Sequence, residues 1–413
     1  MIFSLFFKLL LAAASAQAPA TLKQAYELAL RHSESIAASE QSIKEAEALY
    51  RRALGGAGPE LSFRTAADWE DEQGSRLSPS SQSGLRLAKT DLTGYRELAA
   101  VRAAKADENR KGQLRRRAEQ LLLGDVAGAF FGLLQARENV DATKRLIELA
   151  DQRRTELRER VRVGRNREAD VVGQDFQAAA LRSQLEESTR QAEARTDLLS
   201  YLVHGPFGEP TAPAPAPTAA RPLEDYLARV ETRPDLRAAA EGVREADQLV
   251  RSEQAGRLPR VGAQANLYSH RPASLKDNRW DASLTLGLPL WSWGEVTASV
   301  DAARARAGRQ ELELQSLRRL AQLEVRNAYR DLASARRQLE LRRQAVELAE
   351  KDHDLQDRDE KRGLVPALEG LESLHRLNGA RLSYNNALLA VRLASINLDV
   401  ASGAEGGEVE LLK

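Results

Sequence analysis

The second half of this 413-residue chain repeats the layout of its first half about 200 residues later. The segment KEAEAL around Ala46 returns as READQL around Ala246. Further matched pairs are Pro59 with Pro259, Gly94 with Gly294, and Gly164 with Gly363. The chain is therefore interpreted as an internal duplication.

A heptad pattern runs through the matched region of each half. Large apolar residues fall every seven positions, and small residues follow most of them three positions later. The apolar set is Val126, Leu133, Val140 and Ile147 in the first half, and Val325, Leu332, Leu339 and Val346 in the second. Large and small residues at heptad spacing predict a close-packed coiled-coil seam.

The pattern of glycine and proline divides each half into the same series of elements. The first half predicts a helix over 21–54, a strand over 60–69, a polar loop over 70–83, a weaker strand near Leu85 and Leu87, and then long helices over 95–163 and to about Val203. The second half predicts a helix over 222–255, a strand from Pro259, a strand through Leu284 to Leu290, and helices to Arg362 and to about Ser402. We therefore divide the chain into a leader (1–18), a first repeat (19–205), a Pro/Ala linker (206–221), a second repeat (222–403) and a short tail (404–413).

The first 18 residues are apolar and end in small residues, with Ala14-Ser15-Ala16 as a small-x-small cleavage site. They predict a secretory signal peptide that is cleaved near Ala16, although Lys8 lies inside the apolar run. An N-terminal anchor is the alternative, but the run is shorter than the roughly 20 apolar residues of a spanning helix. No later segment has that length, so a membrane crossing would have to use strands.

Composition excludes several classes of function. Charged residues make up 29% of the chain but give a formal net charge of only +1, and aromatic residues make up 5%. Interleaved charges without stacking aromatics argue against nucleic-acid binding. With no cysteine, the chain has no disulfide, thiolate metal site or cysteine nucleophile. No phosphate loop or nucleophile elbow is present, and the histidines lack metal-ligand spacing, so we expect no enzyme activity and no cofactor.

Strands of about ten residues suit a tilted transmembrane β-strand. Four strands cannot close a barrel, and lipid does not tolerate an open sheet edge, so a membrane form would require several copies; three copies would give 12 strands. The aromatic residues at strand ends fit an interfacial belt, with ordinary core packing as the alternative. They are Trp69, Tyr268, Trp280, Trp291 and Trp293.

Together these features resemble the TolC family of outer-membrane efflux and secretion channels. The resemblance rests on the repeat, the strand pairs, LPLWSWGEV at 288–296, and the glycine turns VGRNREAD at 163–170 and RGLVPALE at 362–369. It implies a mostly α fold with a small β part: long coiled-coil helices forming an α-barrel in the periplasm, and a trimer closing a 12-stranded β-barrel in the outer membrane. It also implies a passive exit duct that works with a periplasmic adaptor and an inner-membrane pump of the RND or ABC type.

The resemblance also implies roles for residues near the glycine turns. Glu369 and Glu372 match acidic side chains that ring the tunnel entrance, with solvated helix surface as the alternative. Asp170 matches an acidic residue of an entrance latch, but the latch partners would fall on Val365 and Glu360, so that latch is not preserved. The adaptor-contact tips are Val163, Gly164, Arg165, Gly363, Leu364 and Val365.

Two other kinds of protein would also contain long helical hairpins. A periplasmic adaptor has one hairpin inside small β-domains, whereas this chain has two hairpins and two strand pairs. A soluble coiled-coil scaffold would explain neither the leucine-faced strands nor the leader peptide.

Overall fold

The computed structural model describes most of the chain after residue 20. The described residues are 21–72, 75–93, 95–164, 167–206, 208–211, 221–271, 277–362, 364–365, 367–404 and 409, with the backbone alone at 68–72, 75–80, 91, 360–361, 367–368 and 371. The predicted leader (1–18), Gly94, Arg165, Gly363, and most of the predicted linker and tail lie outside the described residues.

The chain forms two compact units, and each unit takes segments from both sequence repeats. One unit comprises residues 1–37, 117–233 and 320–413, and the other comprises 38–116 and 234–319. The first unit is entirely helical in its described part, and the second contains the sheet. The repeats are thus units of sequence and not of packing; their exact boundaries stay a prediction.

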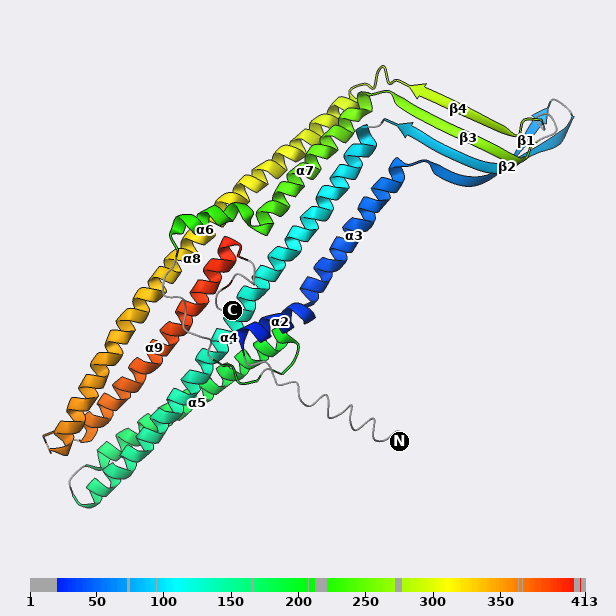
Figure 1. Ribbon diagram of the computed structural model, residues 1–413. Coiled ribbons are helices and arrows are strands. Elements are labelled where there is room, and N and C mark those ends of the chain that lie inside the picture. Colours follow the sequence, from blue (N-terminus) through cyan, green and yellow to red (C-terminus); the bar gives the residue numbers. More distant parts are fainter. Residues whose placement is uncertain are drawn as a thin grey trace, which may run out of the picture. The chain divides into compact units, whose positions relative to one another are not determined.

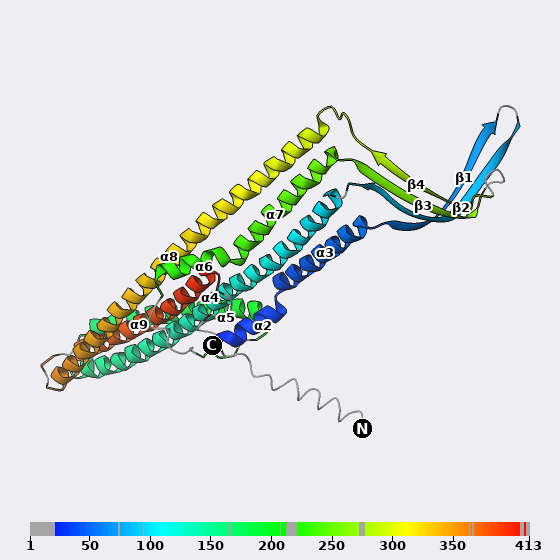
Figure 2. The ribbon, with the colours of Figure 1, turned by 45° about the horizontal axis from the view of Figure 1, so that its top comes forward.

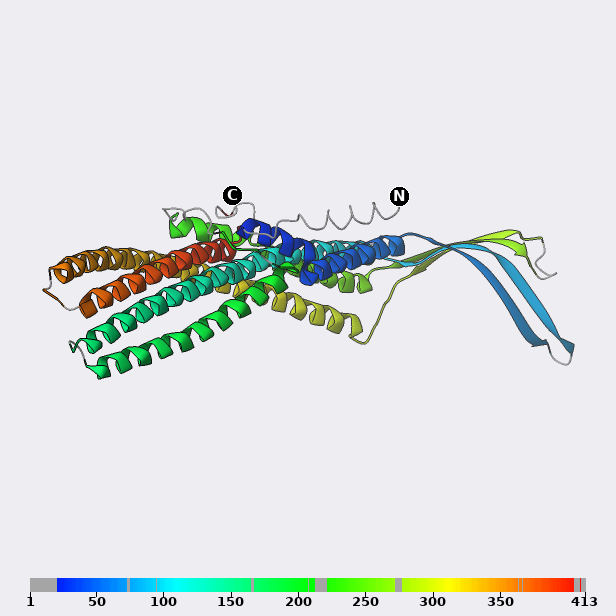
Figure 3. The ribbon, with the colours of Figure 1, turned by 90° about the horizontal axis from the view of Figure 1, so that it is seen from below.

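Four long helices confirm the predicted helical plan (Figure 1). They are α4 (Tyr95–Arg162, 68 residues), α5 (Glu168–Val203, 36 residues), α8 (Glu295–Lys361, 67 residues) and α9 (Ala367–Ser402, 36 residues). In the first unit α5 runs back along α4, and α9 runs back along α8 (Figures 2 and 3). Each half therefore contributes one helical hairpin, and the turn of the first hairpin contains Gly164.

The helix predicted over 21–54 is wrong as a single element. It is divided into α2 (Leu22–His32) and α3 (Glu34–Ala57), because Ser33 adopts an extended ψ of 117°. The Ser33 hydroxyl accepts a hydrogen bond from the Ile36 N–H at 3.4 Å and so caps the start of α3.

The helix predicted over 222–255 is divided at the equivalent position. It becomes α6 (Leu223–Arg229), the short 3₁₀ helix η1 (Val230–Thr232) and α7 (Pro234–Gln254), followed by η2 (Ala255–Arg257). Arg233 is extended with ψ of 137° because a residue before proline is disfavoured in the helical region. Ser33 and Arg233 lie 200 positions apart, so the break belongs to the repeated plan.

The sheet differs from the prediction in the lengths of its strands. It contains β1 (Glu60–Glu72), β2 (Ser75–Leu92), β3 (Arg260–His270) and β4 (Trp280–Gly287), all antiparallel in that order (Figure 1). The predicted polar loop over 70–83 is wrong, because most of that segment continues β1 or begins β2. β4 also ends at Gly287, so Leu288 and Leu290 lie beyond it.

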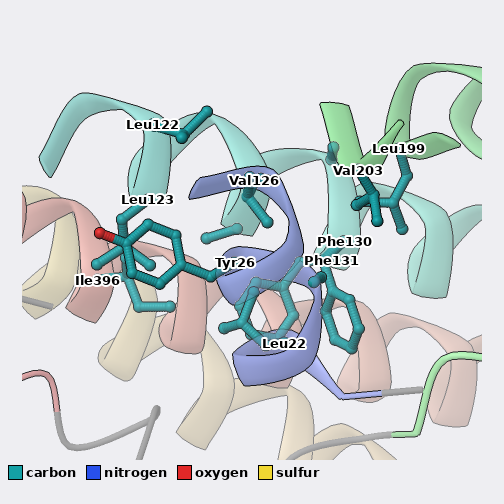
Figure 4. Close-up of a cluster of buried hydrophobic side chains, with 14 of the residues drawn as sticks. Leu22, Tyr26, Leu122, Leu123, Val126, Phe130, Phe131, Leu199, Val203 and Ile396 are labelled. Atoms are coloured by element: carbon teal, nitrogen blue, oxygen red, sulfur yellow. The ribbon is translucent and has the colours of Figure 1, made fainter. Parts of the chain in front are cut away.

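A hydrophobic core cluster lies in the helical unit, where α2 packs among α4, α5 and α9 (Figure 4). Val126 and Leu133 are completely buried, which confirms the first two positions of the predicted seam in α4. Phe130, which lies between them, is also completely buried. Val140 and Ile147 are only half-buried. Tyr26 joins this cluster and donates a hydrogen bond from its hydroxyl to the Glu119 carbonyl at 3.2 Å; burial raises its pKa to about 12.

A buried arginine holds the end of the second hairpin within the same unit. The Arg233 side chain is 2% exposed, and its Nη1 donates to Glu324 Oε2 at 2.8 Å and to the Ala401 carbonyl at 2.9 Å. Gly403, with φ of +86°, ends α9 directly against Arg233. His204 is left-handed at the equivalent end of α5, with φ of 59°. The second half has a glycine at this position because Arg233 fills the space that a Cβ would need. The first half has a histidine at the equivalent position.

We expect Gly403→Ala to destabilise the helical unit by about 1–3 kcal/mol, through left-handed backbone strain and displacement of Arg233. A Cβ at residue 403 would lie 2.6 Å from Arg233 Cγ. Gly379→Ala is the matched control, because Gly379 lies inside α9 with open space around it, so alanine should leave stability unchanged or raise it by about 0.5–1 kcal/mol. Thermal unfolding of the detergent-solubilised protein measures both; equal midpoints for the two variants would contradict this account.

Candidate functional site

One face of the sheet is apolar and exposed. Strand register places Leu61 opposite Leu87, Phe63 opposite Leu85, and Leu85 opposite Leu267, so these side chains share a face. The large side chains of this face are 46–76% exposed in the single chain: Leu61, Phe63, Leu85, Leu87, Leu267, Trp280, Leu284 and Leu286. A continuous exposed apolar surface of this kind marks contact with lipid or with another protein.

The opposite face of the sheet is polar, and its side chains are linked by hydrogen bonds. Arg86 Nη2 donates to Gln264 Oε1 at 2.7 Å. Asp281 accepts from Asn266 Nδ2 and from the Tyr268 hydroxyl, each at 2.7 Å. Arg271 Nη2 lies 3.2 Å from the same carboxylate, and its guanidinium stacks 3.8 Å above the Tyr268 ring. The sheet therefore has the sidedness of a wall between an apolar and an aqueous phase.

Both lateral edges of this sheet are open. β1 and β4 are the outer strands, and each pairs with one neighbour in the described part of the chain. An outer strand presents a row of unpaired backbone N–H and C=O groups, which favours pairing with another chain. The sheet is thus incomplete in a way that further copies could complete.

The predicted interface aromatics lie in three different settings. Trp280 begins β4 on the apolar face and is 69% exposed. Trp291 and Trp293 follow β4 and are 76% and 90% exposed, with their rings edge-on and 6.0 Å apart. Tyr268 instead lies on the polar face, where it binds Asp281. For Trp69 the structure describes only the backbone, which pairs with Pro79.

The first hairpin turn exposes apolar and charged groups at the end of α4. Val163 is 62% exposed, and Gly164 takes a positive φ of +74°, which a glycine adopts without strain. Asp170 accepts the Arg167 backbone N–H at 3.2 Å and lies 3.6 Å from the Arg167 guanidinium. Its carboxylate therefore caps the start of α5, a local role that the sequence did not reveal.

The second hairpin turn carries the more exposed apolar side chain. Leu364 is 70% exposed, and its N–H donates to the Asp359 carbonyl at 2.9 Å, while Val365 is half-buried. Glu369 lies in the first turn of α9, where its charge complements the helix dipole. Glu372 has a 59% exposed side chain, 4.0 Å from Arg376 Nη1. Both predicted entrance carboxylates are therefore open to solvent in the single chain.

A hollow of about 530 Å³ near this turn was not predicted. Helices α4, α5 and α9 line it, with Arg153, Phe176, Glu372 and Arg376 among its side chains. The Arg153 side chain is 5% exposed, whereas Phe176 is 75% exposed. The sequence pattern does not predict this hollow, because arginine and phenylalanine on long helices are ordinary surface and seam residues.

Within the described residues, no cluster of three or more His, Asp or Glu side chains could hold a metal ion. Among the described helices, none combines the length and the hydropathy of a membrane-spanning helix.

Comparison with known proteins agrees with this geometry. Residues 228–404 match the family model described as outer membrane efflux protein. The second half of the chain is thus similar to outer membrane efflux proteins. Protein CyaE of Bordetella pertussis is 29% identical over 252 residues, which cover 58% of this chain and 52% of that protein. The chain thus spans about half the length of this curated relative.

Solved structures share the fold over nearly the whole chain. The CmeC outer membrane channel of Campylobacter jejuni superposes with a TM-score of 0.79 at 17% identity, covering 94% of this chain and 87% of that one. The outer membrane protein VceC of Vibrio cholerae gives 0.78 at 19% identity, covering 93% and 96%. The open-state MtrE outer membrane channel of Neisseria gonorrhoeae gives 0.76 at 20% identity, covering 93% and 89%. These likenesses confirm the predicted fold class, and CmeC and MtrE are outer membrane channels.

Proposed function

We propose that this chain is the trimeric outer-membrane channel-tunnel of a tripartite efflux or type I secretion system. It serves as a passive exit duct for substrates that an inner-membrane pump delivers through a periplasmic adaptor, and it performs no catalysis itself. The carrying observation is the sheet: one exposed apolar face, one polar face and two open edges. In lipid, such a sheet is stable only when its edges are paired, and three copies of four strands would form a closed barrel.

The two faces then take opposite roles. The apolar face contacts lipid, with Trp280, Trp291 and Trp293 near the membrane–water boundary, where tryptophan side chains are enriched. The polar face lines an aqueous lumen. A periplasmic adaptor or a soluble scaffold would not need this division, because neither places a two-sided sheet in lipid.

A cysteine pair on the two edge strands tests the trimer. In the variant Leu61→Cys with Leu286→Cys, the cysteines lie on β1 and β4, more than about 14 Å apart, because three strand spacings separate the strands and Leu286 is four residues from Ala282, the register partner of Leu61. A bismaleimide shorter than about 8 Å would therefore bridge only β4 of one copy and β1 of the next. Because the chain has no native cysteine, we expect a denaturing gel to show bands up to a trimer and none larger.

The matched control is Phe63→Cys with Leu85→Cys, whose positions face each other within one chain, so it should crosslink without forming a ladder. Dimers alone, or an open series of larger species, would disprove the closed trimer.

Tryptophan fluorescence in lipid vesicles gives a second test of the same proposal. The chain has four tryptophans, all in or next to the sheet, so brominated lipids should quench its tryptophan emission.

Glu369 and Glu372 are proposed as the entrance carboxylates. Both are exposed, lie one helical turn apart at the start of α9, and would appear three times around the tunnel. A ring of carboxylates attracts cations and repels anions.

We expect Glu369→Gln with Glu372→Gln to lower the K⁺/Cl⁻ permeability ratio about twofold or more in planar bilayers at low salt. Glu187→Gln with Glu347→Gln is the charge-matched control on exposed helix surfaces, where each glutamate pairs with an arginine on its own helix. If the ratio changes equally in both variants, the entrance assignment is wrong.

The hairpin turns are proposed as the adaptor-contact tips, comprising Val163, Gly164, Arg165, Gly363, Leu364 and Val365. The supporting observation is the exposure of Val163 and Leu364, since large apolar side chains on a turn gain from being covered by a partner. Asp170 is retained here as a residue next to the entrance, with its carboxylate engaged by Arg167.

We expect Leu364→Asp to abolish photo-crosslinking in cells between a probe at residue 167 and a periplasmic adaptor identified by mass spectrometry. The charged side chain would be buried without a partner in the contact. Leu312→Asp is the control, because Leu312 is similarly exposed, at 66% against 70%. Undiminished crosslinking in Leu364→Asp would exclude this turn from the contact.

A further inference from the structure

The polar face of the sheet carries two arginines whose charges are not neutralised there. Arg64 on β1 stands opposite Gly84, and Arg86 lies two residues further along β2 on the same face. The two residues are therefore diagonal neighbours, about 7–8 Å apart at their backbones. No described carboxylate forms an ion pair with either guanidinium, and the Gln264 oxygen that accepts from Arg86 is neutral.

The nearest acidic side chains of this face are engaged or distant. Asp281 is bound by Asn266, Tyr268 and Arg271, so its charge is already matched. Glu60 and Asp68 are each four residues from Arg64 along β1, about 13 Å at 3.3 Å per residue. The middle of the polar face therefore has an excess of positive charge.

A small hollow lies beside the two guanidinium groups. It measures about 220 Å³ and is lined by Arg64, Arg86, Gln264, Asn266 and Tyr268, among others. Gly84 forms part of its floor, and β3 approaches so closely that a Cβ at residue 84 would lie 2.3 Å from the Leu267 carbonyl oxygen. The hollow is thus rich in N–H donors, and guanidinium groups match the planar oxygens of carboxylates, sulfonates and phosphates.

We propose that Arg64 and Arg86 form a binding site for polyvalent oxyanions in the lumen of the channel. This inference rests on the proposed function, since three copies of the arginine pair encircle the lumen only if the sheet closes with its polar face inward. The band would then attract anions, opposite in sign to the Glu369 and Glu372 entrance. Such a duct has two charge zones in series, and molecules that carry both signs of charge have a favourable contact at each zone.

The direct test is binding of pyrenetetrasulfonate, a fluorescent tetra-anion, to the intact detergent-solubilised protein by anisotropy. We expect Arg64→Gln with Arg86→Gln to weaken binding about tenfold or more, because both charge-assisted contacts are lost. Arg64→Lys with Arg86→Lys should retain most of the affinity while losing the paired-donor geometry. Raising KCl from 0.1 to 1 M should abolish wild-type binding, as the Debye length falls from about 10 to 3 Å.

Arg190→Gln with Arg244→Gln is the control, since it removes the same charge from exposed helix surfaces and should bind like wild type. Wild-type protein that does not bind the probe, or equal binding by the Arg64→Gln/Arg86→Gln variant, overturns the proposal. The lysine variant and a crosslinked trimer band show that loss of binding is not loss of folding. Planar-bilayer conductance distinguishes the arginine site from the proposed channel function. Conductance without probe binding would refute the arginine site and leave the channel. Probe binding without conductance would refute the channel and leave the arginines as an anion-binding pair.

Discussion

The structure depends on a narrow apolar seam between helices that are otherwise heavily charged. Val126, Ala127, Phe130 and Leu133 of α4 are fully buried, whereas most of the remaining helix surface carries interleaved acidic and basic groups. Exposed pairs on those surfaces contribute little stability each. The small residues beside this seam decide how closely the helices approach, and longer side chains there would separate them.

The sheet also gathers its apolar side chains on one face, but there they are exposed and not buried. In the helical unit apolar side chains face one another, while in the sheet the leucines face outward and remain 46–76% exposed. Water would disfavour that surface, and lipid would not. The two units thus differ in the solvent to which each is matched, and this difference makes an outer-membrane channel a better account than a soluble scaffold.

Sequence predicted the parts that depend on strong local signals. Long helices without proline and turns at Gly164 followed directly from residue type. The breaks at Ser33 and Arg233 were missed because serine is only a weak helix breaker, and because Pro234 also suits the first turn of a helix. The Ser-rich part of β2 was taken for a loop because its hydrogen bonds to β1, not its side chains, make it a strand. Arg64 and Arg86 were missed because their proximity arises from register across two strands.

The open edges of the sheet have a consequence for how the protein is made. A newly synthesised chain that has not yet met other copies exposes two rows of unpaired backbone groups, one on β1 and one on β4. Any extended peptide could add to them. If closure of the barrel requires three copies, the rate of assembly depends steeply on the concentration of chains. Biogenesis must therefore shield those edges until partners arrive, and a scarcity of chains would lengthen the period in which misassembly competes.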